Sequence, residues 1–236
     1  MHILVTGSNQ GLGLACLKVF LQAGHHVLAC TMVINEDIKS LEKAYPQHLS
    51  VFEMDVSCDN SIARACEEIL ARYKKLDCII NNAGVLTGRN VKIADIDIKE
   101  VRDCFDINVF GAMLVTQKLL SLLLHSDNGS ILNISSEAAI LAAPHYNYSY
   151  CMSKTALTMF TQCLDTELGM NIRCYAIHPG RMRTGMAKLP GMPPDAYEKR
   201  TLLPETTAEG LLRIIAGEVR PEHKTRFIDY LGNPME

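Results

Sequence analysis

The stretch ILVTGSNQGLGLA, residues 3–15, decides the fold, because an apolar run leads directly into a glycine-rich turn and then into helical periodicity. Glycines permit a tight turn and let a pyrophosphate approach the backbone, where it meets the positive end of a helix. A merely structural turn is the alternative, but the position between an N-terminal strand and a helix favours nucleotide binding. The residues expected to contact the nucleotide are Gly7, Ser8, Asn9, Gln10, Gly11, Leu12 and Gly13.

Outward from this turn, short apolar runs alternate with longer segments of helical period. The predicted strands cover residues 2–5, 26–30, 49–53, 78–80, 130–134, 173–177 and 226–229. The predicted helices cover residues 11–23, 36–44, 59–74, 98–124, 149–169 and 206–217. Alternation of this kind predicts an α/β fold of the Rossmann type, a doubly wound parallel sheet with helices on both faces in a three-layer αβα arrangement. Residues 1–236 should form a single domain, with a proline-rich substrate lid at 188–204.

Composition and charge exclude several classes of protein. The net charge is −3 and no Lys/Arg-rich run is present, so nucleic-acid binding is not expected. Met1 leads at once into an apolar strand and no apolar segment approaches the length of a membrane span, which predicts a cytoplasmic protein with no membrane partner. The nine cysteines are scattered without a C-x-x-C pair, so neither a disulfide framework nor a metal site is indicated.

The pentapeptide YCMSK, residues 150–154, carries a candidate catalytic pair. Tyr150 and Lys154 lie four residues apart and share one face of the predicted helix. Tyr148 points elsewhere, and Tyr146 lies two turns from Lys154, about 12 Å away. A nearby ammonium lowers the pKa of a phenol, so Tyr150 is suited to exchange a proton with an alcohol or carbonyl. A solvated helix face with a chance Tyr and Lys is the alternative for this pentapeptide taken alone.

The spacing T-G-x-x-x-G-x-G in the first turn resembles the short-chain dehydrogenase/reductase family. Further matching blocks follow in the family's order: NNAG at 81–84, FDINVFGAM at 105–113, NISS at 133–136, YCMSK at 150–154 and HPGRMRT at 178–184. The later stretches TAEGLLRII and RFIDYLGNP are similar to the small carbonyl-reductase-like branch, although this finer match is less specific. The blocks span almost the whole chain.

The resemblance implies roles for four residues. Ser136 and Tyr150 would hydrogen-bond the substrate oxygen, and Lys154 would bind the nicotinamide ribose and lower the pKa of Tyr150. Asn108 would hold a water that relays protons to Lys154; the alternative is a helix-kink residue that bonds its own backbone. Ser135 should face away from Ser136 because side chains alternate along a strand. Glu137 stands where the family usually has a small neutral residue, and we expect it to point to solvent.

The resemblance also implies further cofactor contacts, at Asp55 and Val56 beside the adenine, at Asn82, Ala83 and Gly84 after the fourth strand, and at Pro179, Gly180, Met182 and Thr184 after the sixth. Asp55 could instead cap the helix beginning near Asp59.

Cofactor choice depends on Thr31, at the end of the second strand. NAD-preferring relatives usually have Asp there, and NADP-preferring relatives commonly have a basic residue at the next position or just before the second glycine. Here those positions hold Met32 and Gln10. Neutral donors remain at Ser8, Asn9 and Thr31, so we expect NADP(H) to be favoured weakly and NAD(H) to be usable as well.

The sequence thus predicts an NAD(P)(H)-dependent oxidoreductase that interconverts a carbonyl and a secondary alcohol. The alternatives are a sugar-nucleotide epimerase or dehydratase, a catalytically idle cofactor-sensing protein, and a scaffold protein. The substrate should be a small carbonyl or alcohol bound by residues 86–89, 140–146 and the lid. The helices at 98–124 and 149–169 are more apolar than one sheet face requires, and relatives commonly pair them, so a homodimer or homotetramer is expected.

Overall fold

The computed structural model describes residues 1–142, 148–187, 198–199, 201–219 and 226–235. The strands are β1 (His2–Thr6), β2 (His26–Thr31), β3 (Leu49–Glu53), β4 (Cys78–Asn81), β5 (Gly129–Ile134), β6 (Ile172–His178) and β7 (Phe227–Asp229). The α-helices are α1 (Gly11–Gln22), α2 (Glu36–Ala44), α3 (Asp59–Arg72), α4 (Ile98–Phe105), α5 (Gly111–Leu124), α6 (Tyr148–Leu168) and α8 (Pro204–Ile215). Short helical turns are η1 (Ile93–Asp95), η2 (Asp106–Phe110), η3 (Glu137–Ala139) and η4 (Gly185–Ala187).

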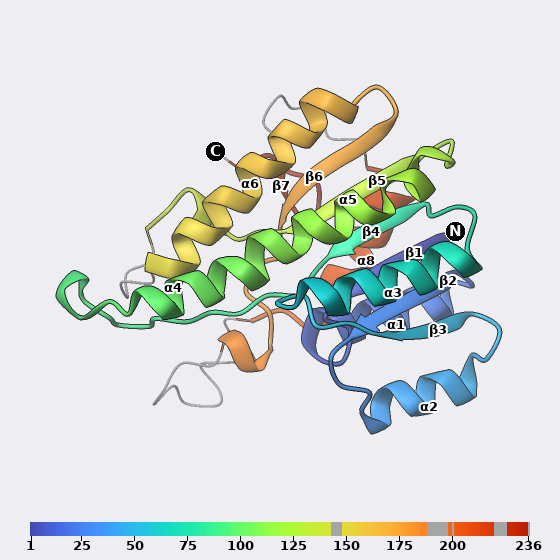
Figure 1. Ribbon diagram of the computed structural model, residues 1–236, viewed down its shortest axis with the longest axis horizontal. Coiled ribbons are helices and arrows are strands. Elements are labelled where there is room, and N and C mark those ends of the chain that lie inside the picture. Colours follow the sequence, from blue (N-terminus) through green and yellow to red (C-terminus); the bar gives the residue numbers. More distant parts are fainter. Residues whose placement is uncertain (143–147, 188–197, 200, 220–225, 236) are drawn as a thin grey trace.

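The strands form one parallel sheet in the order β3-β2-β1-β4-β5-β6-β7. The strand order reverses between β1 and β4, the position at which open α/β sheets bind their ligands. Figure 1 shows α3, α5 and α6 side by side across one face of this sheet. The predicted doubly wound fold is therefore confirmed.

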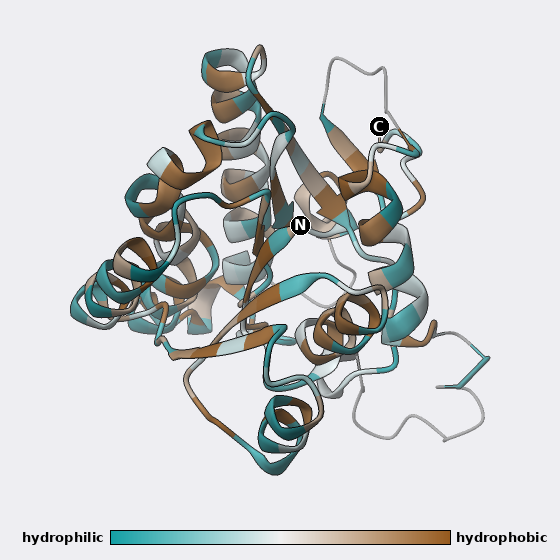
Figure 2. Ribbon diagram, turned by 90° about the vertical axis from the view of Figure 1, so that its right-hand side faces the viewer, coloured by the Kyte–Doolittle hydropathy of each residue, from teal (hydrophilic) through white to brown (hydrophobic). Residues whose placement is uncertain are grey.

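Two apolar layers hold the helices on the sheet. One cluster joins side chains of α1, α2 and α8 to one face, and the other joins α3, α5 and α6 to the opposite face. Figure 2 shows these two helical layers on either side of the strands, which are largely hydrophobic. Strands buried on both faces read as continuous apolar runs, which is why β1, β2 and β4 were recognisable from sequence alone.

The turn after β1 requires glycine at two positions. Gly7 has φ of +63°, and a Cβ there would stand 2.8 Å from the Cα of Ala83. A Cβ on Gly13 would stand 2.3 Å from the Gly7 carbonyl oxygen. Any larger residue would push the turn away from β4 or from α1, so the close packing of these elements depends on both glycines.

The predicted helix at 98–124 is divided by a π-helical turn, η2, between α4 and α5. The run Ile98–Leu124 is the one described segment that is long and apolar enough to cross a membrane, so the expectation that no segment approaches this length was wrong. Half of its most apolar window is buried, and α5 packs against α3 while α4 packs against α6. The apolar side chains on one side of this run therefore pack into the protein core.

Most element boundaries lie within one or two residues of those predicted, and two of these differences have a clear physical cause. Strand β7 begins at Phe227 rather than Arg226, because Arg226 has φ of +49°, in the left-handed region rather than the β region. Helix α8 begins at Pro204, inside the predicted lid, with proline at the first helical position where its missing N–H costs nothing. Most of that lid, residues 188–197 and 200, lies outside the described residues.

Candidate active site

The predicted site residues converge at the carboxyl ends of β1, β4, β5 and β6. The methyl group of Thr184, after β6, faces Gly11, where a Cβ would stand 3.4 Å from Thr184 Cγ2. A Cβ on Gly84, after β4, would stand 3.2 Å from Asn108 Oδ1 and 3.4 Å from Lys154 Nζ. Five distant segments of the sequence therefore meet at one edge of the sheet.

Hydrogen bonds to the residues that follow β4 hold the glycine-rich turn in place. The Thr6 hydroxyl oxygen accepts from the backbone N–H groups of Asn82 and Ala83, both at 3.0 Å. The Asn82 amide donates to the carbonyl oxygens of Thr6 and Gly7, at 2.8 and 3.2 Å. The side chain of Asn82 thus acts on the turn that would hold the nucleotide.

The start of α1 fits a pyrophosphate. Its N-cap residue, Gln10, makes no side-chain capping hydrogen bond, and the first turn holds no acidic residue. The first N–H groups of a helix have no partner within the helix and carry its positive partial charge. The start of α1 therefore offers backbone donors of the kind that bind a dinucleotide phosphate.

Tyr150 and Lys154 lie on the same face of α6, as helical spacing predicts. The Lys154 ammonium is 5.6 Å from the centroid of the Tyr150 ring and donates to the Ile134 carbonyl oxygen at 2.7 Å. Lys154 is 4% exposed, and burial lowers its pKa to about 8. Tyr146 lies outside the described residues.

The predicted lowering of the Tyr150 pKa by Lys154 is wrong for this structure. Burial raises the pKa of the phenol, and the hydrogen bond with Ser136 and the charge of Arg89 oppose that rise only in part. The ammonium of Lys154 is directed to Ile134 and contributes no resolved lowering. Desolvation outweighs it because a buried phenolate loses its hydration. Tyr150 is therefore a protonated phenol at neutral pH.

The two serines that follow β5 have different partners, and their opposite orientation stays a prediction. The Ser136 hydroxyl lowers the pKa of the Tyr150 phenol and accepts from the Ala138 N–H at 3.2 Å. The Ser135 hydroxyl donates to the Lys154 carbonyl oxygen at 3.2 Å and lies 2.7 Å from the Thr158 hydroxyl. Glu137 is exposed, in agreement with its expected direction toward solvent.

Asn108 lies buried in η2 and ties three segments together. Its Oδ1 accepts from the Val85 N–H at 2.8 Å, and its Nδ2 donates to the Val85 carbonyl and the Ser153 hydroxyl, both at 2.9 Å. The Cys104 sulfur lies 3.3 Å from the same Nδ2. The side chain thus bonds the backbone of the loop after β4 and not its own backbone, so the alternative of a helix-kink residue bonded to its own backbone is wrong. The water relay stays a prediction.

Sequence reasoning missed two residues of this cluster, Cys104 and Ser153. Cys104 stands four residues before Asn108, a spacing that places both on one helical face and could have revealed it. Ser153 directly precedes Lys154 and was not considered, because the side chains of adjacent helical residues point in different directions. Its hydroxyl donates to the Tyr150 carbonyl at 2.9 Å, and this contact links Asn108 to the backbone of α6.

On the adenosine side, two expected phosphate donors are already engaged. The Ser8 hydroxyl is fully buried and donates to the Cys30 carbonyl at 3.1 Å. The Thr31 hydroxyl donates to the Val33 carbonyl, also at 3.1 Å. Each hydroxyl donates its proton to a backbone carbonyl, so neither is free to donate to a 2′-phosphate here. Asn9 holds the same loop through its carbonyl oxygen, which accepts from Asn35 at 2.8 Å.

Asp55 does not cap α3. Its carboxylate accepts from the Ser57 N–H at 2.9 Å and the Ser57 hydroxyl at 2.7 Å, which closes a local turn before the helix. The N-cap residue of α3 is Cys58, and its side chain makes no capping bond. The capping alternative is wrong, and Asp55 and Val56 remain beside the end of β3, where an adenine contact is expected.

The turn after β6 is held by α8 and by the segment before it. The Thr207 hydroxyl donates to the Pro179 carbonyl at 2.8 Å, and Gly180 has φ of +74°. Met182 forms a bridge with Leu202, and the Thr184 N–H donates to the Met182 carbonyl at 2.9 Å. The structure thus brings this turn to the mouth of the site, opposite the glycine-rich turn.

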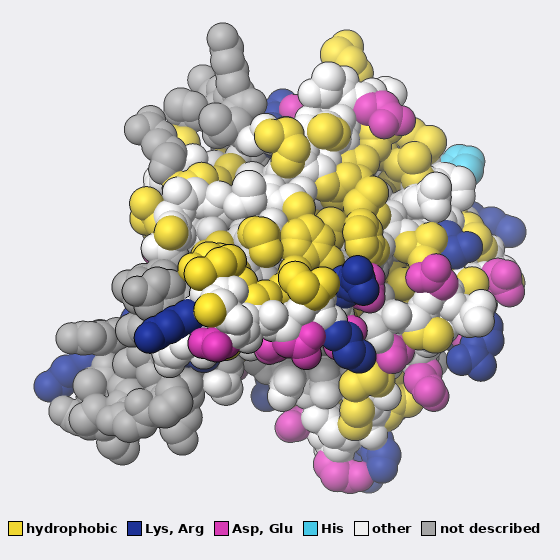
Figure 3. Space-filling model, turned by 60° about the vertical axis from the view of Figure 1, so that its left-hand side comes forward, with side chains coloured by type: hydrophobic (Ala, Val, Ile, Leu, Met, Phe, Trp, Pro, Cys, Tyr) yellow, Lys and Arg dark blue, Asp and Glu magenta, His cyan; other side chains and the backbone are white. Residues whose placement is uncertain are grey.

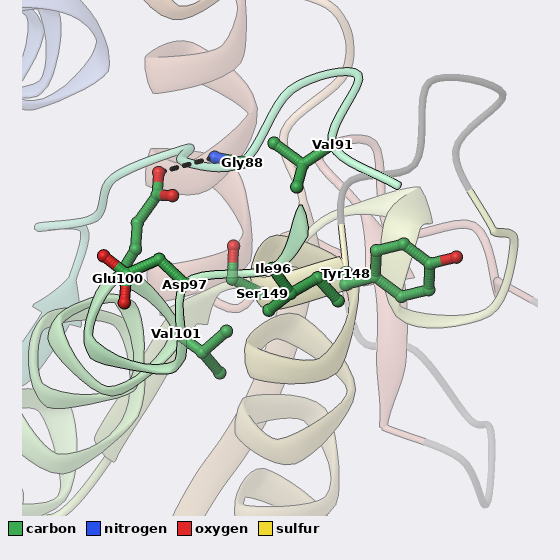
Figure 4. Close-up of a pocket in the computed structure, with 8 residues that line it drawn as sticks. All are labelled: Gly88, Val91, Ile96, Asp97, Glu100, Val101, Tyr148 and Ser149. Atoms are coloured by element: carbon green, nitrogen blue, oxygen red, sulfur yellow. Dashed lines mark hydrogen bonds between the residues drawn. The ribbon is translucent and has the colours of Figure 1, made fainter. Parts of the chain in front are cut away.

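A cavity of about 10 Å³ lies behind the loop that follows β4 (Figure 4). Its lining comes from that loop, from α4 and from the first residues of α6: Gly88, Val91, Ile96, Asp97, Glu100, Val101, Tyr148 and Ser149. This volume holds no more than about one water molecule. The cavity is therefore a packing gap behind the loop and does not accommodate a substrate.

A doubly wound α/β sheet with a glycine-rich phosphate turn at its switch point, and a Tyr/Lys/Ser group beside it, defines a nucleotide-dependent oxidoreductase of the Rossmann class. The family model for short chain dehydrogenases matches residues 1–191. The chain belongs to the short-chain dehydrogenase/reductase family. This is the family that the ordered sequence blocks resemble.

Individual relatives agree with this assignment. A fatty acyl-CoA reductase of Acinetobacter baylyi is 32% identical over 233 residues, covering 97% of this chain and 76% of that protein. A 3-oxoacyl-[acyl-carrier-protein] reductase of Thermotoga maritima is 29% identical over 225 residues, covering 91% of this chain and 90% of that protein. The NADPH-bound carbonyl reductase from chicken fatty liver superposes with a TM-score of 0.86 at 25% identity, over 99% of this chain and 98% of that one.

Proposed function

We propose that the chain reduces a carbonyl compound to a secondary alcohol with a nicotinamide cofactor, and oxidises the alcohol in reverse. The observation that carries this proposal is the group formed by Tyr150, Ser136 and Lys154 at the open end of β5. The Ser136 hydroxyl lowers the pKa of the Tyr150 phenol there, and the Lys154 ammonium lies 5.6 Å from the phenol ring. Two neutral donors beside a buried cation suit a reaction that builds negative charge on oxygen.

Each residue then has a distinct task. The substrate oxygen accepts hydrogen bonds from Tyr150 and Ser136, and Tyr150 gives up its proton as the carbonyl oxygen becomes an alcohol. Burial keeps the Tyr150 pKa raised, so the phenol holds this proton at neutral pH. Lys154 would bind the nicotinamide ribose, and Asn108 holds the loop after β4 against α6. The nicotinamide, when bound, supplies the hydride.

The test replaces the proton donor alone. Tyr150→Phe should abolish turnover of a panel of aldehydes and ketones, followed by nicotinamide absorbance, while nucleotide affinity stays nearly the same. Tyr148→Phe is the matched control, because Tyr148 stands two residues before Tyr150 on α6 and therefore lies on a different face of the helix. Equal loss of activity in the two variants would overturn the assignment of Tyr150.

For the cofactor, we propose that the chain uses both NADPH and NADH, with a modest preference for NADPH. No carboxylate stands at position 31 to repel a 2′-phosphate, and the side chains that follow, Met32 and Val33, are exposed and apolar. The engaged hydroxyls of Ser8 and Thr31 add no attraction. A site with neither repulsion nor a charge pair discriminates weakly.

For assembly we propose a homodimer or homotetramer formed through α4, α5 and α6. Figure 3 shows hydrophobic side chains gathered in the middle of the face that it presents. Phe110, Met113, Met152 and Met159 on these helices are 53, 39, 46 and 56% exposed. Contiguous exposed apolar side chains of this size favour association. Light scattering that detects only a species of about 26 kDa, the mass of one chain, at micromolar concentration would contradict this proposal.

The remaining alternatives have a common test. A thermal melt at saturating NADPH should shift upward if the chain binds the nucleotide, whereas an unchanged melt would support a scaffold role. A shift together with no turnover on any carbonyl would support an idle cofactor-sensing protein. The cytoplasmic location stays a prediction.

A further inference from the structure

Arg89 stands in a sharp turn of the loop that follows β4. Its two neighbours, Gly88 and Asn90, have φ of +68° and +59°. Left-handed backbone at a residue other than glycine is uncommon and costs about 1–2 kcal/mol. Such conformations persist only where surrounding contacts impose them. The turn around Arg89 is therefore held in place by the rest of the fold.

The contacts that hold this turn come from α4 and α6. The Gly88 N–H donates to the Glu100 carboxylate at 2.8 Å, a bond drawn in Figure 4. The Thr87 and Ser149 hydroxyls lie 3.0 Å apart, and the Ser149 hydroxyl also lies 3.2 Å from the Thr87 carbonyl. Ser149 directly precedes Tyr150, so the turn is fixed to the first residues of the catalytic helix.

The Arg89 side chain extends from this turn over the site. Its guanidinium donates to the Met186 carbonyl of η4, which follows β6, and thus spans from one side of the site to the other. Its positive charge lowers the pKa of the Tyr150 phenol. Arg89 is half-buried and forms no ion pair with any carboxylate in the described parts of the chain.

A half-buried guanidinium without a carboxylate partner has unused donors and an uncompensated charge. Arginine presents five N–H groups in a planar fork that matches a carboxylate or a phosphate. The single carbonyl of Met186 uses one nitrogen, Nη2. An anionic group on the substrate would take up the free edge and compensate the charge. A hydrogen bond between charged groups contributes more than one between neutral groups.

We propose that Arg89 binds an anionic group, a carboxylate or a phosphate, on the substrate, so that the preferred substrates are small carbonyl compounds carrying such a group. This proposal rests on the proposed reduction of carbonyls at Tyr150. It names a specificity residue for that reaction and a chemical class of substrate. Met186 is the internal acceptor that the substrate anion would displace or join.

The experiment compares each anionic substrate with a neutral partner of the same skeleton. 2-Oxo and 4-oxo carboxylic acids are measured against their methyl esters, and dihydroxyacetone phosphate against dihydroxyacetone, in wild type, Arg89→Gln and Arg89→Lys. The readout is the ratio of kcat/KM for the anionic member to that for the neutral member. Arg64→Gln, at an exposed position on α3, is the control for loss of one arginine from the surface.

We expect the wild type to favour one anionic series by at least about tenfold, the size of one charge-assisted contact. Arg89→Gln should remove that preference, Arg89→Lys should retain part of it, and Arg64→Gln should match the wild type. Comparison of the carboxylic acid series with the phosphate series shows which of the two anions Arg89 binds. Thermal melts with NADPH confirm that each variant is folded before its ratio is interpreted.

An equal ratio in wild type and Arg89→Gln would overturn the role of Arg89 while the proposed reduction stands. A wild-type preference for the neutral members would also overturn the role of Arg89 while the proposed reduction stands. Turnover that survives Tyr150→Phe, or none on any member of the panel, would overturn the proposed function, and the role of Arg89 would fall with it.

Discussion

Replacing Lys154 with methionine removes a buried charge, and the structure indicates how the effect on stability should depend on pH. Burial lowers the pKa of Lys154 from 10.5 to about 8. Between these values the unfolded chain holds the proton and the folded chain does not, so stability should rise with pH. Carrying the charge at pH 7 therefore costs the folded wild type about 3 kcal/mol, relative to a pH at which both states are neutral.

Methionine has no proton to lose, so this cost is absent from the variant. Lys154→Met also deprives the Ile134 carbonyl of its donor, a loss of about 1–3 kcal/mol that does not depend on pH. The informative quantity is therefore the change with pH of the stability difference between variant and wild type. We expect the variant to lose about 2 kcal/mol of its relative stability between pH 7 and pH 9.5.

Urea denaturation of wild type and Lys154→Met, without nucleotide, at the two pH values measures this difference directly. Lys74→Met, at an exposed position after α3, controls for the loss of a surface lysine. A stability difference for Lys154→Met that stays constant within about 0.5 kcal/mol, the usual limit of agreement between independent sites, would show that Lys154 is not a desolvated charge in the folded protein. The variant should also lose turnover.

Two further predictions concern the nucleotide site. Asn82→Ala removes the donors to the Thr6 and Gly7 carbonyls and should cost about 1–3 kcal/mol of stability by urea denaturation and weaken NADPH binding, whereas Asn60→Ala, at an exposed position on α3, should do neither. Thr31→Asp should move preference toward NADH by loss of NADPH binding, since an unpaired carboxylate beside a phosphate is costly. A wild-type kcat/KM that favours NADH by more than about a hundredfold, roughly 2.7 kcal/mol, would contradict the interpretation of positions 31 and 32.

The sequence by itself determined the class of fold and the place of the site. Strands buried on both faces read as apolar runs, and amphipathic helices show their own period, so the local pattern located every strand and placed most boundaries within one or two residues. Because parallel strands end at one edge, residues that follow β1, β4, β5 and β6 had to meet there. The helical spacing of Tyr150 and Lys154 likewise follows from local geometry.

Only the tertiary structure decided how these groups are partnered and charged. The Ser8 hydroxyl donates to β2 and the Thr31 hydroxyl to its own loop, whereas the sequence left both available to a phosphate. The Tyr150 pKa is raised rather than lowered, because desolvation depends on every segment packed around the phenol. The turn around Arg89 is held by contacts with α4 and with α6, and the second of these helices lies far from the turn along the chain. Periodicity reports which side of an element is buried, but hydrogen-bond partners and hydration are set by neighbours that only folding brings together.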